Sequence, residues 1–365
     1  MTVRGPVAPE ALGLTLSHEH LLCDLRALWH PPPAGRPDLE ALVDVDPAPR
    51  DRGPLCSDPY VCRPNLLLDN PDLMVQELAY FQQAGGGALV ELTTLGLEPR
   101  PAELRRISEA AGVHVVAGCG WYRQVTDPPG LDVLEEEALY GQLLQEIGEG
   151  FPGSGGVRPG IIGEIGTGDP LHPDEHKALR AAGRAQQATG LALAVHLALW
   201  GRQGGRVLDV LEDAGADLSR VLLCHLGEQP FARDYHHSLL ERGACLGFDT
   251  FGAEYALDGS GQSPAGSAGQ SPAGSAGQSP AGYAGRRLTT DEERIAGLRA
   301  LLDGGYAAQL FISQDICERL QLRAYGGFGY AHLLTTIRPR LRRAGVDDSA
   351  LDQLLRVNPA RLLAH

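Results

Sequence analysis

Histidine and carboxylate residues stand at the ends of several β-rich segments of this chain. The first segment, 14–21, carries His18-Glu19-His20. Side chains two apart on a strand point the same way, so both imidazoles can face one metal ion while Glu19 points to the opposite side. Four later β-rich segments end in further ligand-type residues: Glu164, His196, His225 and Asp315. Imidazole nitrogens and carboxylate oxygens together suit Zn²⁺, Mn²⁺, Co²⁺ or Fe²⁺.

Each of these residues has an ordinary structural explanation when it is taken alone. A lone histidine such as His196 is more often a hydrogen-bonded core residue than a ligand, Glu164 could belong to a salt bridge, and Asp315 could cap a helix. The joint pattern is more specific, because ligand residues end several segments that would meet at one edge of a parallel sheet. The sequence therefore predicts one shared metal site.

The elements that would position these ligands alternate along the chain. The expected strands are 14–21, 88–95, 114–121, 161–166, 192–197, 221–226, 244–250 and 310–316. The expected helices are 72–83, 102–111, 133–147, 173–189, 205–214, 230–242 and 290–303. Apolar strands alternating with helices indicate a parallel sheet buried on both faces. Eight such units favour an α/β fold of the (β/α)8 TIM barrel type, with an open doubly wound sheet as the alternative.

Two segments depart from this alternation within what we expect to be a single domain over residues 1–365. Residues 30–70 are rich in proline and polar groups, and are expected to form a long loop after the first strand. Residues 261–285 repeat the octet GQSPAGSA after the seventh strand. Glycine, serine and proline without bulky apolar side chains cannot offset the entropy lost on ordering, so a flexible insertion is expected there.

Composition limits the partners and the compartment. The formal net charge of −15 disfavours binding to nucleic acid or to an anionic membrane. The seven cysteines are odd in number and irregularly spaced, which favours free thiols in a reducing cytosol. The sequence shows neither a signal-like N-terminus nor an apolar run long enough to span a membrane, so a cytoplasmic protein with a small-molecule substrate is expected. A homodimer stays open.

Several motifs together resemble the phosphotriesterase family of the amidohydrolase superfamily, and most closely its phosphotriesterase-related branch. They are LGLTLSHEHLLCD (12–24), IIGEIG (161–166), AVHL (194–197), LCHLGE (223–228), SQDICERLQLRAYGGFGYAHLL (313–334) and VNPARLL (357–363). These motifs run across the whole chain in the family's order. The repeat at 261–285 has no counterpart that the family leads us to expect.

The resemblance implies a role for each ligand in a site with two divalent ions. His18, His20 and Asp315 would hold the more buried ion, and His196 and His225 the more exposed one. Many members bridge the two ions with a carboxylated lysine at the end of the fourth strand. This chain has Glu164 there, as the related branch often does, and the shorter side chain should draw the ions toward that strand. Zn²⁺ is the expected metal, with Mn²⁺, Co²⁺ and Fe²⁺ as alternatives.

A metal-dependent hydrolase follows from this site. A hydroxide that bridges the two ions would be the nucleophile, because metal binding lowers the pKa of water to roughly 7. The exposed ion would polarise the carbonyl or phosphoryl oxygen of the substrate. Asp315 would be the catalytic residue that carries the proton to the leaving group. The expected substrate is an ester, lactone or amide of a small molecule, with any phosphotriesterase activity incidental.

Residues that follow the strands are expected to form the substrate pocket. The candidates are Trp121, Tyr122, Trp200, Glu228, Arg323 and Tyr325. Aromatic residues can form apolar walls, and Arg323 can either recognise an anionic group or fix its own loop by an ion pair. Asp249, at the end of the seventh strand, can either support a metal ligand or be purely structural.

Two other functions compete with hydrolysis. A mononuclear deaminase on the same barrel would share the histidines and the aspartate, but would place a glutamate soon after the histidine of strand 5. Here His196 is followed by Leu-Ala-Leu, while the His-x-x-Glu spacing from His225 to Glu228 falls on strand 6. A metal-containing or ligand-binding protein without turnover is the second alternative. Release of ammonia from a purine or pyrimidine would favour the deaminase.

Overall fold

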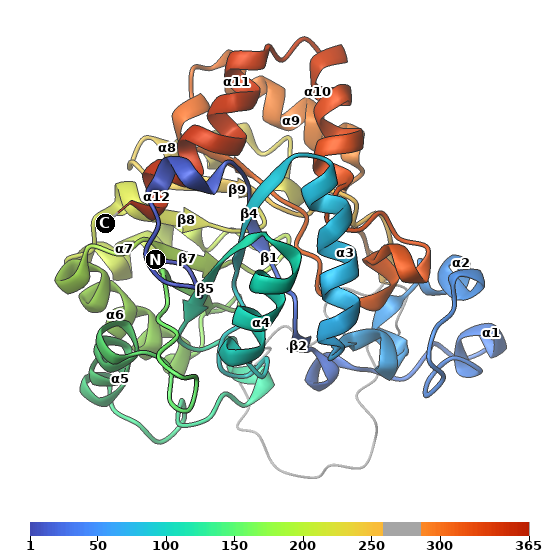
Figure 1. The fold of residues 1–365 in the computed structure, drawn as a ribbon, viewed down its shortest axis with the longest axis horizontal. Helices are drawn as coiled ribbons and strands as arrows, with labels where there is room; N and C mark the ends of the chain where they lie inside the picture. The colour runs from blue at the N-terminus through green and yellow to red at the C-terminus, as the bar shows by residue number, and fades with distance from the viewer. Residues whose placement is uncertain (258–285, 365) are drawn as a thin grey trace.

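The core of the protein is an eight-stranded parallel sheet. A computed structural model describes residues 1–257 and 286–364 and orders the strands β1-β4-β5-β6-β7-β8-β9-β12 (Figure 1). The strands are Leu14–Glu19, Gly86–Glu91, His114–Cys119, Ile161–Gly166, Leu193–His196, Val221–Leu223, Cys245–Phe248 and Leu310–Ile312. These strands coincide with the eight expected ones, and the predicted (β/α)8 barrel is confirmed.

Hydrogen bonds between the ends of β1 and β12 join the first strand to the last. Asp315 N donates to His18 O at 3.2 Å, and His20 N donates to Ile316 O at 3.2 Å. The carboxylate of Glu19 accepts hydrogen bonds at this seam, from Ser313 Oγ at 2.7 Å and from Ile316 N at 3.0 Å. Glu19 therefore holds together the two strands that carry three of the predicted ligands, a role that the sequence did not indicate.

Helices cover the outside of the sheet. Those between the barrel strands are α3 Pro71–Gln83, α4 Pro101–Ala111, α5 Glu136–Glu149, α6 Pro173–Thr189, α7 Gly204–Asp213, α8 Arg233–Leu240 and α9 Asp291–Asp303. Local sequence sets where they begin: the Thr290 hydroxyl accepts from Glu293 N at the start of α9, which satisfies an otherwise unpaired backbone donor. After β12 come α10 Arg338–Arg343, α11 Asp348–Asp352 and α12 Asn358–Leu363, with α10 and α11 packed near α9 (Figure 1).

Two clusters of apolar side chains form most of the core, one inside the barrel and one between the strands and the surrounding helices. Along β4, Ala88 and Val90 belong to the inner cluster and Leu89 to the outer one, because successive side chains of a strand point to opposite faces. Leu12, just before β1, and Leu362 of α12 join the inner cluster. They fill the amino end of the barrel, so the carboxyl end is left for the polar side chains.

Residues 30–70 are more ordered than the expected loop. They contain α1 Pro37–Glu40, α2 Arg52–Leu55 and β3 Leu67–Leu68, which pairs antiparallel with β2 Cys23–Asp24. A small apolar cluster explains this order, because Leu39 and Leu55 of this segment pack with Tyr255 and Leu288 from the region after β9. The prediction of a long loop was therefore wrong, since distant apolar partners stabilise the segment.

The other elements are short. The antiparallel pair β10 Ala256–Leu257 and β11 Arg286–Arg287 flanks residues 258–285, so the repeat predicted at 261–285 lies outside the described residues. Single turns of helix are η1 Pro9–Leu12, η2 Arg26–Leu28, η3 Pro49–Asp51, η4 Pro59–Val61, η5 Arg63–Leu66, η6 Gln124–Thr126, η7 Leu218–Arg220, η8 Leu226–Glu228, η10 Ala307–Gln309, η11 Arg319–Gln321, η12 Arg323–Tyr325, η13 Leu333–Ile337 and η14 Gln353–Val357.

All seven cysteines are free thiols. Within the described residues, no helix is both long and apolar enough to cross a membrane.

Candidate metal centre

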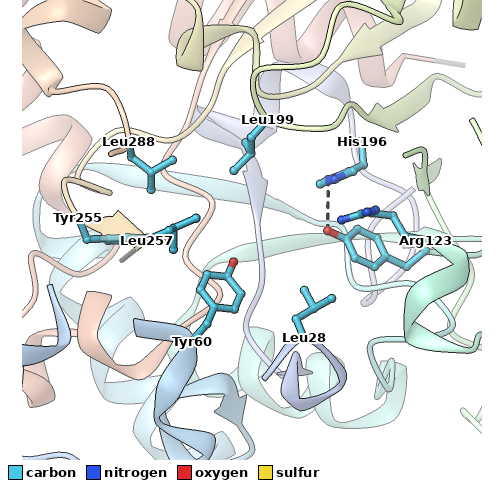
Figure 2. Close-up of a pocket in the computed structure, with 9 residues that line it drawn as sticks. Leu28, Tyr60, Arg123, His196, Leu199, Tyr255, Leu257 and Leu288 are labelled. Atoms are coloured by element: carbon cyan, nitrogen blue, oxygen red, sulfur yellow. Dashed lines mark hydrogen bonds between the residues drawn. The ribbon is translucent and has the colours of Figure 1, made fainter. Parts of the chain in front are cut away.

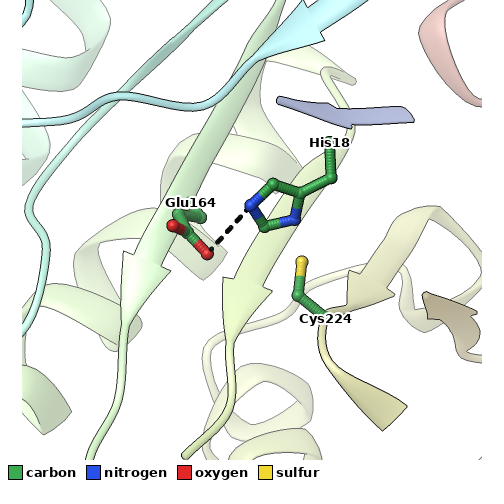
Figure 3. Close-up of side chains that lie close together, drawn as sticks. All are labelled: His18, Glu164 and Cys224. Atoms are coloured by element: carbon green, nitrogen blue, oxygen red, sulfur yellow. Dashed lines mark ion pairs between the residues drawn. The ribbon is translucent and has the colours of Figure 1, made fainter. Parts of the chain in front are cut away.

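The six predicted ligands meet at the carboxyl end of the barrel. They come from five strand ends and are His18, His20, Glu164, His196, His225 and Asp315. His18 Nε2 lies 3.5 Å from Glu164 Oε2 and 3.4 Å from Asp315 Oδ1. Figure 3 shows the ring of His18 facing the Glu164 carboxylate, with the Cys224 thiol beneath it.

These ligands form two groups, and the Glu164 carboxylate lies next to both of them. In the first group are His18, His20 and Asp315, and in the second are Glu164, His196 and His225; within each group the ligand atoms lie within 4.8 Å of one another. Glu164 Oε1 is 3.6 Å from His20 Nε2, while its Oε2 is 3.5 Å from His196 Nδ1 and 3.6 Å from His225 Nε2. The carboxylate therefore stands between the two groups, where a bridging ligand would stand.

Two buried polar atoms test whether divalent cations fit this arrangement. His18 Nε2 and Glu164 Oε2 are both buried and have no hydrogen-bond partner in the described structure. Leaving a buried polar group unsatisfied costs about 1–3 kcal/mol, and more if the group is charged. A cation held between nitrogen and carboxylate oxygen ligands would satisfy both atoms. The donor set thus fits a divalent metal.

The charges at the centre favour the ligand forms of Glu164 and His196, whereas nearby carboxylates raise the pKa of His18, His20 and His225 against the effect of burial. Burial alone would raise the pKa of Glu164, but the facing imidazoles, His18 foremost, lower it well below its usual range. Burial lowers the pKa of His196 to about 4, against the opposing effect of Glu164. An ionised carboxylate and a neutral imidazole are the forms that bind metal.

Asp249 holds two of the ligands from behind. Its Oδ2 lies 3.2 Å from His18 Nδ1 and its Oδ1 lies 3.1 Å from His225 Nδ1, while His225 N donates to the same Oδ1 at 2.9 Å. The Thr93 hydroxyl is likewise 2.9 Å from His20 Nδ1. Hydrogen bonds of this kind fix which ring nitrogen faces the metal. Of the two explanations left open for Asp249, the structure supports a positioning role.

Asp249→Asn is expected to weaken metal binding by about 10- to 100-fold, because an amide can accept from only one of the two imidazoles. Competition with a chromogenic chelator measures the affinity, and the exposed Asp132→Asn is the matched control. Unchanged metal affinity in Asp249→Asn with an unchanged circular dichroism spectrum would show that Asp249 does not orient the ligands.

A pocket opens beside the centre (Figure 2). It is lined by Leu28, Tyr60, Tyr122, Arg123, His196, Leu199, Tyr255, Leu257 and Leu288. His196 belongs both to the pocket and to the ligand set, and the Tyr122 hydroxyl lies 3.2 Å from its Nδ1. A molecule in this pocket would therefore contact His196, one of the six predicted ligands.

Comparison with known proteins shows to which family the chain belongs. Its sequence matches the phosphotriesterase family over residues 1–363. The chain belongs to the phosphotriesterase family. Two curated relatives are N-acetyltaurine hydrolases, from Tetraodon nigroviridis at 33% identity and from Homo sapiens at 31% identity. Each alignment covers 99% of this chain and 97% of the relative.

Solved structures of the phosphotriesterase family share the fold of this chain. A resiniferatoxin-binding protein from Rhodobacter sphaeroides has a TM-score of 0.89 and 36% identity, covering 100% of this chain and 94% of that one. The phosphotriesterase homology protein from Escherichia coli, with phosphate in its active site, has a TM-score of 0.75 and 27% identity over 97% and 99% of the two chains. A mutant phosphotriesterase-like lactonase from Deinococcus radiodurans has a TM-score of 0.71 and 26% identity, covering 100% of this chain and 99% of that one.

Only one of the six predicted substrate residues of this phosphotriesterase-family chain lines the described pocket, namely Tyr122. Trp121 is fully buried on the other side of the same strand end, where its indole nitrogen donates to Pro129 O at 3.2 Å. Trp200 has the Arg286 guanidinium 5.4 Å from its ring. Trp121 and Tyr122 differ because neighbouring residues of an extended segment point to opposite sides.

The remaining three residues contact side chains that do not line the pocket. Arg323 stacks on Tyr80 at 4.0 Å, and Tyr325 lies 5.8 Å from the Arg319 guanidinium. Glu228 is buried in an ion pair with Arg294 at 2.7 Å. The segment after β12 thus folds against helix α3 and its surroundings, and the structure does not bring these residues to the pocket.

Sequence reasoning missed most of the pocket wall. Arg123 immediately follows the predicted Tyr122, so its position was a usable signal. Tyr60 and Tyr255 come from segments that show neither regular periodicity nor a motif. Their place in the pocket depends on the apolar cluster that joins residues 30–70 to the region after β9.

Proposed function

We propose that this chain is a metal-dependent hydrolase that uses two divalent ions, Zn²⁺ first, to cleave an amide, ester or lactone bond of a small molecule. The division of six ligands into two groups by Glu164 carries the proposal. Among the three bonds we place the amide first, because the curated relatives that align over nearly the whole chain are named N-acetyltaurine hydrolases.

The ligands would divide the work between the ions. His18, His20 and Asp315 would hold one ion, His196 and His225 the other, and Glu164 would touch both. Bound there, two divalent ions would supply the activation of a water molecule and the polarisation of the substrate's carbonyl oxygen. Tyr122, 3.2 Å from His196 Nδ1, can donate a hydrogen bond to the same carbonyl oxygen as its charge develops.

We assign the proton transfer to Asp315. It is the one carboxylate of the ligand set with appreciable exposure, 19% against 2% for Glu164. Water oxygen forms a bond to the carbonyl carbon, and Asp315 accepts the proton that the water loses. The same proton then passes to the leaving nitrogen or oxygen as the carbon–nitrogen or carbon–oxygen bond breaks, so the products are a carboxylic acid and an amine or alcohol.

Removing the metal is expected to lower hydrolysis by at least about 100-fold, since Lewis-acid stabilisation of the transition state is worth several kcal/mol. The protein is dialysed against a chelator and reloaded with Zn²⁺, Mn²⁺ or Co²⁺, and hydrolysis is followed on N-acetyltaurine, a lactone, a p-nitrophenyl ester and a phosphotriester. Elemental analysis gives the metal count. Full activity in the metal-free protein would refute the proposal.

A binding function without turnover is the second candidate. One observation favours it: the resiniferatoxin-binding protein shares 36% identity with the whole of this chain. Intact metal loading with no hydrolysis of any of the four substrate types would support this candidate. The deaminase alternative is weakened by the position of Glu228, which the ion pair with Arg294 holds away from the pocket.

A further inference from the structure

We propose that Glu91 is a positioning residue of the metal centre, which acts on the ligand His20 through the hydroxyl group of Thr93. The chain Glu91–Thr93–His20 keeps the proton of the His20 ring on Nδ1 and leaves Nε2 to bind a metal ion. This inference rests on the metal centre of the proposed function. It adds a residue that is not one of the six predicted ligands.

Glu91 and Thr93 come from the carboxyl end of β4, the neighbour of β1 in the barrel. Glu91 is the last residue of β4 and pairs with Glu19, the last residue of β1. His20 and Thr93 both follow these strands closely, so they lie side by side. None of the six predicted ligands lies on β4. The end of this strand is therefore placed to support a ligand of its neighbour.

The Glu91 carboxylate accepts three hydrogen bonds. Its Oε1 accepts from Thr93 Oγ1 at 2.5 Å and from Leu21 N at 3.2 Å, and its Oε2 accepts from Thr93 N at 3.4 Å. Burial raises the pKa of Glu91, while His20 and these hydrogen bonds act in the opposite direction. Three donors on two oxygens favour the ionised carboxylate, which can only accept.

The hydroxyl group of Thr93 passes this preference on to His20. Its Oγ1 lies 2.5 Å from Glu91 Oε1 and 2.9 Å from His20 Nδ1. A hydroxyl has one proton to donate, and the short contact with a carboxylate directs that proton to Glu91. The oxygen then offers a lone pair to His20, whose Nδ1 has to be the donor. All three side chains are at most 3% exposed, so water competes little with these bonds.

The other nitrogen of the His20 ring faces the remaining ligands. His20 Nε2 lies 3.3 Å from Asp315 Oδ1 and 3.6 Å from Glu164 Oε1. A neutral imidazole with its proton on Nδ1 carries its lone pair on Nε2, the nitrogen on the side of the metal centre. The tautomer that Thr93 selects is therefore the one that the proposed centre needs.

Chelator competition and NMR on the zinc-loaded protein test this chain of hydrogen bonds. Thr93→Val removes the hydroxyl at nearly constant size and is expected to weaken zinc binding by about 10- to 100-fold. Thr93→Ser keeps the hydroxyl and should restore most of the affinity. The downfield N–H signal of His20 Nδ1 should persist in Thr93→Ser and move upfield in Thr93→Val. The exposed Thr335→Val is the matched control.

A double-mutant cycle shows whether Glu91 acts through Thr93. An amide accepts at only one of its two ends, so Glu91→Gln cannot keep all three donors paired. With Thr93 present, Glu91→Gln is expected to weaken zinc binding by at least about twofold, the lower end of the coupling between residues in contact. In the Thr93→Val background the same substitution should have no further effect. The exposed Glu109→Gln is the matched control.

Neither readout needs turnover, so this inference and the proposed function can fail separately. A wild type that binds zinc but cleaves none of the four substrate types would end the hydrolase proposal, while the cycle still reports on Glu91. Equal effects of Glu91→Gln with and without the Thr93 hydroxyl would overturn the inference, as would a His20 ring proton on Nε2. Glu91 would then only satisfy backbone donors.

The Nδ1 signal also decides the question if Thr93→Val does not fold. Glu91→Gln keeps Thr93, and circular dichroism shows whether it keeps the fold. An upfield shift of the His20 N–H signal in the folded Glu91→Gln supports the inference, because Glu91 does not contact the ring itself. An unshifted signal would overturn it.

Discussion

Glu164→Ala is expected to lower the rate of hydrolysis by at least about 100-fold, as removal of the metal does, because the variant should lose bound metal. The Glu164 carboxylate faces both ligand groups, with Oε1 toward His20 and Oε2 toward His18, His196 and His225. Without it, four imidazoles would have to bind two cations with a single remaining carboxylate, Asp315. Elemental analysis should show fewer than two metal ions per chain.

Two further variants separate the effect of the length of the Glu164 side chain from the effect of its negative charge. Glu164→Gln keeps the size of the side chain but removes its charge, so it should resemble Glu164→Ala in metal content. Glu164→Asp keeps the charge on a shorter side chain and should retain one metal and part of the activity. Two tightly bound metals and full activity in Glu164→Ala would show that Glu164 does not bridge.

Arg294→Met is expected to destabilise the protein by about 3–5 kcal/mol, because it leaves Glu228 as an uncompensated buried charge. Both side chains of this ion pair are 0% exposed, with Arg294 Nη2 2.7 Å from Glu228 Oε1. Arg294 also pairs with Asp291 at 3.0 Å, and Glu228 accepts from Thr250 and Thr289. Denaturant unfolding of the metal-loaded protein measures the effect.

The double variant Glu228→Gln/Arg294→Met is the decisive comparison. Removing the second charge should recover part of the stability lost in Arg294→Met, because no buried charge of the pair then remains. Glu228→Gln alone should destabilise the protein with little change in KM. A raised KM at unchanged stability would instead restore the substrate-binding role that the sequence suggested for Glu228.

The fold and the metal ligands could be predicted from the sequence because both follow from local patterns. Apolar runs of strand length alternate with helical segments, and that periodicity defines a parallel barrel without knowledge of distant contacts. In such a barrel all strands end at one face. The residue type at the end of each strand, such as His196 in the last position of β7 or Asp315 shortly after β12, therefore indicates a candidate ligand there.

Supporting contacts could not be predicted in the same way. Asp249 was visible as a polar residue at a strand end, but its hydrogen bonds to His18 and His225 depend on the packing of β1, β8 and β9 around one point. Thr93 beside His20 had no signal in the sequence, since threonine is common in strands.

The substrate pocket depended on tertiary structure for a different reason. Its wall joins segments far apart in the chain, from Leu28 and Tyr60 to Leu257 and Leu288, that pack through side chains and not through a regular repeat. A charged residue that follows a strand suggests a substrate-binding role when only the sequence is considered. Yet the partner that a charge finds, such as Arg294 for Glu228, is set by folding and can hold it away from the pocket.

By itself, the sequence determined the barrel, the family and the set of metal ligands, because strand periodicity and the residue at each strand end are local properties. The family resemblance also implied that Glu164 bridges the two ligand groups. Only the tertiary structure decided which side chains line the pocket beside them, Tyr60, Arg123 and Tyr255 among them. The physical reason is distance along the chain. Contacts between residues hundreds of positions apart form only when the packed core brings their backbones together, and no local pattern encodes which side chains then meet.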